Sequence, residues 1–143
     1  MTHEDNLQRV VHFYESLTFD SVSQIESMYS QDALFKDSFN EVRGIPAIRR
    51  IFLHMFNQVD APRFEITTKI VQGDTAFLTW NFYFRMKRFS KDEQCMRGAT
   101  HLEFSENGHI TLHRDYCDVA EELYEKIPML GGLMRFLKNA ANK

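Results

Sequence analysis

The sequence predicts a single α+β domain, residues 1–143, in which helices cover one face of a curved antiparallel sheet. Helical spacing of hydrophobic residues predominates before Arg63, and stretches rich in aromatic and β-branched residues predominate from Arg63 to Cys117. Helices followed by a run of strands are typical of this class. With 143 residues, 43% of them hydrophobic, the chain suffices for one core that buries roughly two-thirds of the unfolded surface.

Three helices are expected in the first part of the chain. The first extends from about Thr2 to Ser16, and Thr2 is suited to cap it. Its apolar stripe contains Leu7, Val10, Val11, Tyr14 and Leu17. A second, short helix starts near Asp20 or Ser21 and is marked by Val22, Ile25, Met28 and Tyr29. The third follows Gly44 and Pro46, and its broad apolar face consists of Ile48, Ile51, Phe52, Met55, Phe56 and Val59.

The strands are expected mostly in the second half. A short strand, Ala33 to Lys36, precedes a turn from Ser38 to Gly44. The longer strands are Arg63–Val71, Thr75–Phe89, Gln94–Phe104 and His109–Cys117. They are separated by turns at Gly73-Asp74, Lys91-Asp92-Glu93 and Glu106-Asn107-Gly108, and Asn-Gly is a strong hairpin signal. Four strands joined by short turns predict an antiparallel meander.

The last segment, Glu121 to Lys143, differs from the rest of the chain. Its leucines have helical spacing, Pro128 and Gly131-Gly132 interrupt it, and it carries basic but no acidic residues after Glu125. We expect a helical tail, 121–143, that packs over the sheet or acts as a lid. A basic amphipathic segment is also suited to contact a partner or an anionic membrane surface.

Composition excludes several classes of function. The formal charge is −3, from 17 basic and 20 acidic residues without a basic cluster, which argues against nucleic-acid binding. The polar start of the chain and the absence of a long apolar run predict a cytoplasmic protein. Two isolated cysteines and six scattered histidines lack metal-site spacing, so we expect neither a metal nor another cofactor.

Three segments resemble a known superfamily. They are Tyr29–Asp37, Arg43–Ile48 and Asn107–Asp118. Together they resemble the nuclear transport factor 2-like superfamily, which includes ketosteroid isomerase and the SnoaL-like polyketide cyclases, and the resemblance extends from Asn6 to about Ala120. It implies a cone-shaped, cystatin-like fold, most similar to SnoaL-like proteins of bacteria.

Similarity to ketosteroid isomerase implies roles for three residues. Asp37 matches the general base, and Tyr14 matches the tyrosine that donates a hydrogen bond to the oxyanion. Thr100 stands where that enzyme has a protonated acid, and its hydroxyl is a weaker donor, which argues against steroid isomerisation itself. Each residue has a structural alternative. Tyr14 lies on a core stripe, and Asp37 ends a strand, where an acid commonly organises a turn.

Similarity to the cyclases implies a second candidate base, Asp115. The cyclase motif ends in His-Trp-Asp with a further acid three residues later, and this chain has His113, Arg114, Asp115 and Asp118. The alternatives are an ion pair of Asp115 with Arg97 or Arg114, and a purely structural role for His113. His113 and Asp115 could also share a proton through direct contact.

Strand alternation gives two answers for this last strand. It places His113, Asp115 and Cys117 on one face, which the resemblance puts inside the cone. The apolar residues Ile110 and Leu112 predict the opposite orientation. A local bulge or a sheet that is buried on both faces would reconcile the two, and we follow the resemblance.

These observations lead to three hypotheses of function. The first is cofactor-independent acid/base chemistry of the isomerase, cyclase or dehydratase type on a small apolar carbonyl compound, with Asp37, Asp115, His113 and Tyr14 as catalytic residues. The second is non-catalytic binding of such a molecule. In both, the expected ligand-binding residues are Thr100, Cys117, Trp80, Phe56 and Phe82. The third is a dimeric interaction module, and a homodimer through the outer sheet face is expected in any case.

Overall fold

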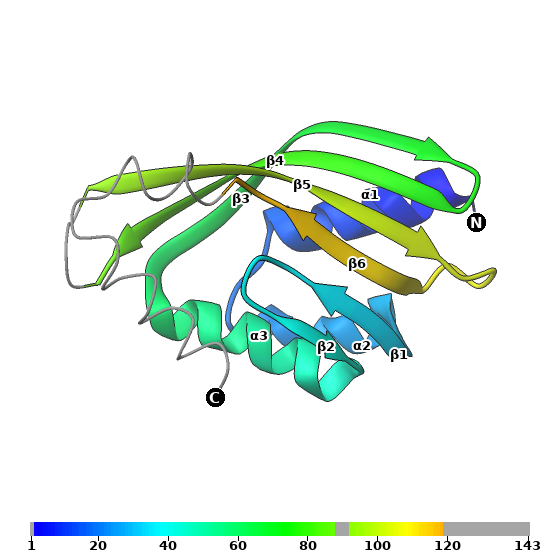
Figure 1. Ribbon diagram of the computed structural model, residues 1–143, viewed down its shortest axis with the longest axis horizontal. Coiled ribbons are helices and arrows are strands. Elements are labelled where there is room, and N and C mark those ends of the chain that lie inside the picture. The colour runs from blue at the N-terminus through cyan, green and yellow to red at the C-terminus, as the bar shows by residue number, and fades with distance from the viewer. Residues whose placement is uncertain (1, 88–91, 119–143) are drawn as a thin grey trace.

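The computed structural model describes residues 2–87 and 92–118, which form one curved sheet with helices packed against it (Figure 1). Residues 88–91 and the expected tail, 121–143, lie outside the described part. The helices are α1 (His3–Glu15), a 3-10 turn (Asp20–Gln24), α2 (Ile25–Met28) and α3 (Ile45–Gln58). The strands are β1 (Tyr29–Lys36), β2 (Glu41–Arg43), β3 (Val59–Gln72), β4 (Thr75–Met86), β5 (Glu93–Phe104) and β6 (Ile110–Tyr116).

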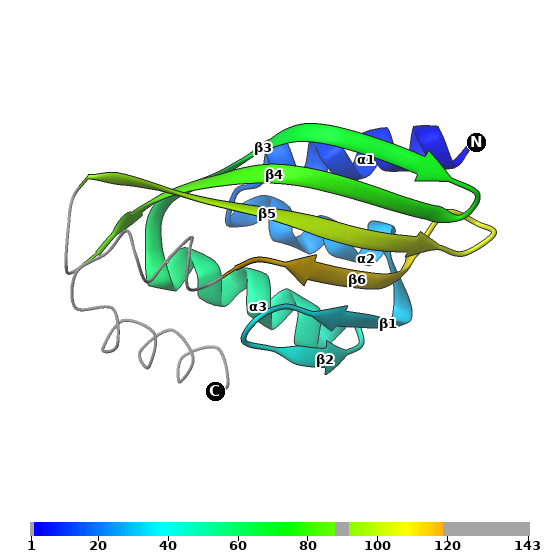
Figure 2. The same ribbon diagram turned by 45° about the horizontal axis from the view of Figure 1, so that its top comes forward.

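The sheet is open and has six strands in the order β2-β1-β6-β5-β4-β3. The expected meander of β3 to β6 is antiparallel throughout. β1 pairs with β6 in parallel, so a strand from the first third of the chain lies beside β6. Figure 2 shows α1 and α3 on the same side of this sheet. The predicted α+β class, with helices on one face of a curved sheet, is confirmed.

Local sequence explains the helix boundaries. Thr2 and Asp5 form a reciprocal capping box, so α1 begins where the sequence predicts. Gly44 has φ +96°, a conformation that favours glycine, and Pro46 follows in the first turn of α3. The α3 helix ends at Gln58 rather than Val59, because Val59 already pairs with Met86 in the sheet.

Alternation along β4 builds the inner wall of the domain. Every second side chain is buried on the helix side: Ala76, Leu78, Trp80, Phe82, Phe84 and Met86. The paired strand β3 has register shifts between Asp60 and Arg63 and between Ile66 and Thr68. Such irregularities bend a strand, and they let β3 and β4 curve around α3. α1 packs against β3, and α3 packs against β3, β1 and β2.

Three local predictions differ from the structure. Tyr29 opens β1 instead of ending the second helix, and β1 is longer than the expected Ala33–Lys36. The expected turn from Ser38 to Gly44 contains a short edge strand, β2, paired with β1. β3 begins at Val59, before the irregularity at Ala61, where φ is +50°.

Candidate functional site

An apolar cavity of about 230 Å³ lies between α3 and the inner face of the sheet. Its aromatic lining comes from Tyr14, Phe35, Phe39, Phe52, Phe64, Trp80, Phe82 and Phe84. Its polar lining comes from Asp37, Ser38, Asn40, His54, Gln58, Thr100, His113, Asp115 and Cys117. The cavity thus joins an apolar interior to a few polar groups, which is the usual composition of a small-molecule site.

A bulge in β6 turns its polar residues into this cavity. Ile110 pairs with Phe104, but Leu112 pairs with Glu103, so Thr111 is the extra residue. As a result Ile110 and His113 both face the core, with exposed fractions of 0% and 3%. The conflict between hydrophobic alternation and the cyclase motif is therefore resolved by the local irregularity, and Asp115 lies level with Thr100 on the inner face.

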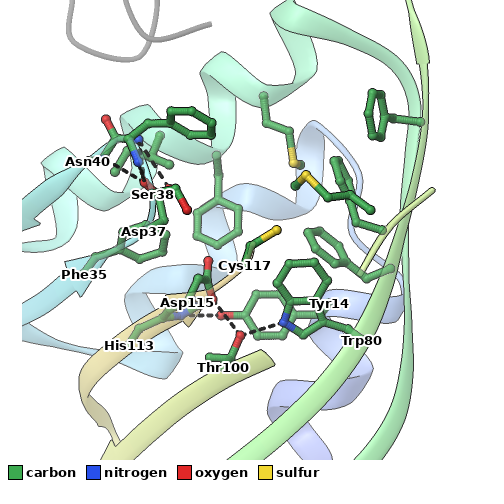
Figure 3. Close-up of a pocket in the computed structure, with 18 of the residues that line it drawn as sticks. Tyr14, Phe35, Asp37, Ser38, Asn40, Trp80, Thr100, His113, Asp115 and Cys117 are labelled. Atoms are coloured by element: carbon green, nitrogen blue, oxygen red, sulfur yellow. Dashed lines mark hydrogen bonds and ion pairs between the residues drawn. The ribbon is translucent and has the colours of Figure 1, made fainter. Parts of the chain in front are cut away.

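A chain of hydrogen bonds holds Asp115 from two sides (Figure 3). Trp80 Nε1 donates to Thr100 Oγ1 at 2.8 Å, and Thr100 Oγ1 donates to Asp115 Oδ1 at 2.6 Å. His113 Nε2 lies 2.8 Å from the same oxygen. Because a carboxylate only accepts, Nε2 carries the proton of the imidazole. Among the described residues no donor reaches Asp115 Oδ2, so this oxygen is the one available to a ligand.

Two tyrosines complete the network at the other ring nitrogen of the histidine. His113 Nδ1 lies 2.8 Å from the Tyr14 hydroxyl and 2.7 Å from the Tyr29 hydroxyl, and the two hydroxyls also contact each other. Nδ1 offers one lone pair, so it accepts from one tyrosine at a time. Only Tyr14 lines the cavity. If Tyr29 donates to His113, the Tyr14 proton is available to a ligand.

Burial keeps both tyrosines protonated. Desolvation raises the pKa of Tyr14 well above its ordinary value, and the neighbouring Tyr29 and the charge of Asp115 act in the same direction. The pKa of Tyr29 is also raised by desolvation, with a further contribution from Asp115. Both hydroxyls therefore remain hydrogen-bond donors throughout the physiological pH range.

Asp37 lines the same cavity, but its carboxylate accepts hydrogen bonds from the turn that follows it. Its Oδ1 accepts the backbone N–H of Phe39 at 2.8 Å and that of Asn40 at 2.6 Å, and the Asn40 amide contacts both carboxyl oxygens. Burial raises the pKa of Asp37, the Phe39 N–H opposes this shift, and the charge of Asp115 adds to it. The carboxylate closes the hairpin between β1 and β2, which is the structural alternative that the sequence offered.

The other expected site residues divide into two groups. Thr100, Trp80, Phe82 and Cys117 line the cavity, although the Thr100 hydroxyl is occupied by Asp115 and the Cys117 thiol donates to the Arg97 carbonyl at 3.3 Å. Phe56 lies outside the lining. Helical rotation turns its ring away from the cavity and edge-on to Phe19, with 6.1 Å between the ring centroids.

The ion pairs that the sequence offered as an alternative role for Asp115 do not form among the described residues. Its partners among the described residues are His113 and Thr100, not Arg97 or Arg114. The Arg114 guanidinium lies over the Tyr116 ring, 4.8 Å from its centroid, on the other side of the strand.

Two contributors to the site were missed in the sequence. Tyr29 opens the segment Tyr29–Asp37 on which the resemblance rests, but its helical spacing from Val22, Ile25 and Met28 obscured its place in β1. Gly98 faces Trp80 across β4 and β5, and a Cβ there would lie 2.3 Å from Trp80 Cη2. An isolated glycine within a strand pattern signals such a close approach, and here it lets the indole reach Thr100.

Within residues 2–87 and 92–118, no group of three or more His, Cys, Asp or Glu residues is placed to hold a metal ion. No helix in that part of the chain has the length and apolar character needed to cross a membrane.

Comparison with known proteins identifies the family. The model of the SnoaL-like domain matches residues 10–113, and the chain belongs to this family. Its fold is the nuclear transport factor 2-like fold. None of the curated proteins compared with the chain matches it in sequence.

Solved structures share the fold at low sequence identity. A hypothetical protein with a ketosteroid isomerase-like protein fold, from Catenulispora acidiphila DSM 44928 and in complex with trimethylamine, is 14% identical over 86% of this chain and 92% of its own, with a TM-score of 0.71. An M. tuberculosis epoxide hydrolase of the LEH-like type is 18% identical over 94% of each chain, with a TM-score of 0.68. A putative SnoaL-like polyketide cyclase from Shewanella putrefaciens is 19% identical over 85% of this chain and 98% of its own, with a TM-score of 0.69.

Proposed function

We propose that this protein catalyses cofactor-independent acid/base chemistry, of the isomerase, cyclase or dehydratase type, on a small apolar carbonyl compound. The placement of Asp115 supports this proposal most directly. Its Oδ1 is held by His113 and Thr100, while Oδ2 has no donor among the described residues, within a cavity that is otherwise mostly apolar. A fixed carboxylate with one open oxygen has the properties of a general base.

In the proposed reaction, Asp115 Oδ2 takes a proton from the carbon next to the substrate carbonyl. The electron pair of that C–H bond moves into the new C=C bond, and the carbonyl becomes an enolate. Tyr14 donates its O–H to the enolate oxygen, while Tyr29 donates to His113 Nδ1 and keeps the imidazole proton on Nε2. Where the substrate has a C=C bond between its β- and γ-carbons, the enolate is a dienolate. Return of the proton from Asp115 to the γ-carbon then moves the C=C bond into conjugation with the carbonyl and completes an isomerisation without a cofactor.

Asp115 is favoured over Asp37 as the base because the hydrogen bonds of the two carboxylates differ. Both oxygens of Asp37 receive donors from its own turn, with three bonds to Oδ1 and a further one to Oδ2. A proton transfer to Asp37 would have to disturb the turn. Asp115 can accept a proton on Oδ2 and keep both bonds to Oδ1.

Deuterium exchange into 2-tetralone tests the proposal. This compact apolar ketone has acidic C–H bonds beside its carbonyl, and exchange in D2O can be followed by NMR. We expect the wild-type protein to accelerate exchange, and Asp115→Asn to lose about 100-fold of that acceleration. The amide of this variant would keep an acceptor for His113 and Thr100, so the fold should survive. Asp37→Asn is the matched control and should retain exchange. Equal exchange by wild type and Asp115→Asn would contradict the assignment.

Non-catalytic binding is the second candidate function, and the apolar lining of the cavity favours it. A binding protein would hold 2-tetralone in the cavity, detected as a change in Trp80 fluorescence, without accelerating its exchange. Trp80 is the one tryptophan of the chain, so the signal reports on this cavity. Binding without exchange would favour this function over the first.

We also propose a homodimer through the outer face of the sheet. Ile70 and Phe77 form a cross-strand pair on that face and are 59% and 45% exposed. Phe77 also stacks on His101 of β5, with 4.8 Å between the ring centroids. An exposed apolar patch of this kind is typical of an interface. Light scattering should report twice the 16.9 kDa chain mass, and Phe77→Lys should yield the monomer.

A further inference from the structure

Gln58 presents a buried hydrogen-bond acceptor that its neighbours leave unpaired. It is the last residue of α3 and lines the cavity. Its Oε1 is buried and has no hydrogen-bond partner, and it is the sole side-chain atom in that state among the described residues. A buried acceptor without a donor is unfavourable, so such an atom in a cavity calls for a ligand group that pairs with it.

The position of Gln58 is remote from Asp115. Asp115 and Thr100 lie level with Leu78 of β4, whereas Val59, which follows Gln58 directly, lies level with Met86. Leu78 and Met86 are eight positions apart on β4, which bends around α3. The curvature of the sheet shortens the distance across the cavity, but the two polar groups still lie at opposite ends of its inner wall.

The residues between the two ends are apolar and adaptable. Phe82 stacks on Phe84, with 5.1 Å between the ring centroids, and Met55 and Met96 also line the cavity. Aromatic rings favour planar ligands, and methionine side chains adjust to their outline. The cavity volume of about 230 Å³ exceeds the ~150 Å³ that accommodates benzene and lies below the usual ~300 Å³ minimum of a drug-sized site. These dimensions suit two fused or linked rings.

We propose that Gln58 selects ligands that carry a hydroxyl group at the end opposite to the group bound by Asp115. The ligand class is a planar apolar compound of two fused or linked rings with a polar group at each end. A hydroxyl donates to Oε1, and it would also accept from the amide nitrogen if the side chain were turned over. This inference rests on the proposed use of the cavity as a ligand site, and it names the substrate class of that site.

Two pairs of probes test the role of Gln58. The pairs are 2-naphthol with 2,6-dihydroxynaphthalene, and the longer 4-phenylphenol with 4,4′-biphenol. In each pair the second compound adds a hydroxyl at the far end. Titration calorimetry should show that this hydroxyl tightens binding to the wild-type protein by about tenfold in at least one pair, the value of one well-paired hydrogen bond.

The variants identify the partner of that hydroxyl. Gln58→Met keeps the side-chain length without the amide and should abolish the gain, and Gln58→Leu provides a second apolar variant if the first folds poorly. Asn57→Met removes the exposed amide next in sequence and should leave the gain intact. An equal gain in wild type and in the folded Gln58 variants would overturn the inference, as would failure of all four probes to bind the wild type. The exchange test of Asp115 is independent, so either proposal can fail alone.

Discussion

The indole of Trp80 occupies the space that a side chain at position 98 would need. Gly98 is its cross-strand partner, and a Cβ there would lie 2.3 Å from Cη2 and 2.5 Å from Cζ2 of the ring. The ring therefore extends across β5 and brings Nε1 within 2.8 Å of Thr100 Oγ1. In the proposed reaction Gly98 would be a positioning residue, because the space beside it lets the indole donate to the Thr100 hydroxyl that binds Asp115.

Gly98→Ala should destabilise the protein by about 1–3 kcal/mol, because the added methyl group overpacks the inner face of the sheet. It should also slow 2-tetralone exchange by displacing the donor to Thr100. Urea unfolding measures the first effect and NMR the second. Trp80→Phe has a smaller ring that leaves room for the added methyl group. The double variant Gly98→Ala with Trp80→Phe should therefore lose less free energy of unfolding than the sum of the two single variants. Additive losses would contradict a direct clash between the two positions.

Alkaline titration should show that Tyr14 and Tyr29 resist ionisation. Burial raises the pKa of both in the folded protein above the unfolded value of about 10. Each tyrosine therefore contributes stability that is fully present below that value and is lost as the pH rises above it. Ultraviolet absorbance at alkaline pH should show tyrosinate forming on these two residues only when the protein unfolds. Tyr14→Phe and Tyr29→Phe assign the delayed signal, and ionisation before unfolding would contradict the prediction.

Asp37 should influence stability through its turn and through its charge, and two variants separate these effects. Asp37→Ala removes the acceptor of the Phe39 and Asn40 N–H groups and should cost about 1–2 kcal/mol at acidic pH, where the contribution of Asp37 is fully present. Asp37→Asn keeps an acceptor and removes the titration. Burial raises the pKa of Asp37, so its contribution is fully present below the unfolded value and falls as the pH rises through the folded value.

Urea unfolding between pH 4 and pH 7 measures this titration. The stability of the wild type relative to Asp37→Asn should fall with rising pH. A constant difference between the two proteins would show that Asp37 titrates alike in the folded and unfolded states.

Gln58→Met should stabilise the ligand-free protein by about 1 kcal/mol, because it removes a buried acceptor that has no partner among the described residues. This corresponds to a rise in melting temperature of about 4 °C. Scanning calorimetry measures it, with Asn57→Met as the control on the exposed side. A stability gain at the cost of ligand affinity is expected where a residue is retained for binding. A destabilised Gln58→Met would mean that the amide supports the fold.

The fold was predictable where the deciding contacts are local. Neighbouring residues alone determine three features: the capping box of Thr2 and Asp5, the alternation of β4 and the Asn-Gly hairpin. β2 was missed because Glu41–Arg43 is short and polar and gains its strand form only by pairing with β1. A bulge in β6 was considered, because hydrophobic alternation and the cyclase motif disagree there, but its position at Thr111 depends on the register with β5.

The candidate site was predictable in part, and mainly through resemblance. His113 and Asp115 were expected to line one cavity with Tyr14, and the structure places all three there. Their chemical roles stay predictions. Tyr29 was missed because residues on a helix and at a strand start can share the same spacing. Gln58 could not be found, because an unpaired acceptor is defined by what surrounds it in space.

The parallel pairing of β1 with β6 has a consequence for when the cavity is completed during synthesis. Tyr14 and His113 are 99 residues apart in the chain, yet they share one hydrogen bond. At roughly 5–20 residues per second, a ribosome needs several seconds to proceed from Tyr14 to His113, and the tyrosines lack this hydrogen-bond partner during that time. Contacts this distant in sequence also close slowly. The hydrogen-bond network around His113 can therefore form only after β6 has been synthesised, and a nascent chain released before β6 would have the helices and part of the cavity wall but neither His113 nor Asp115.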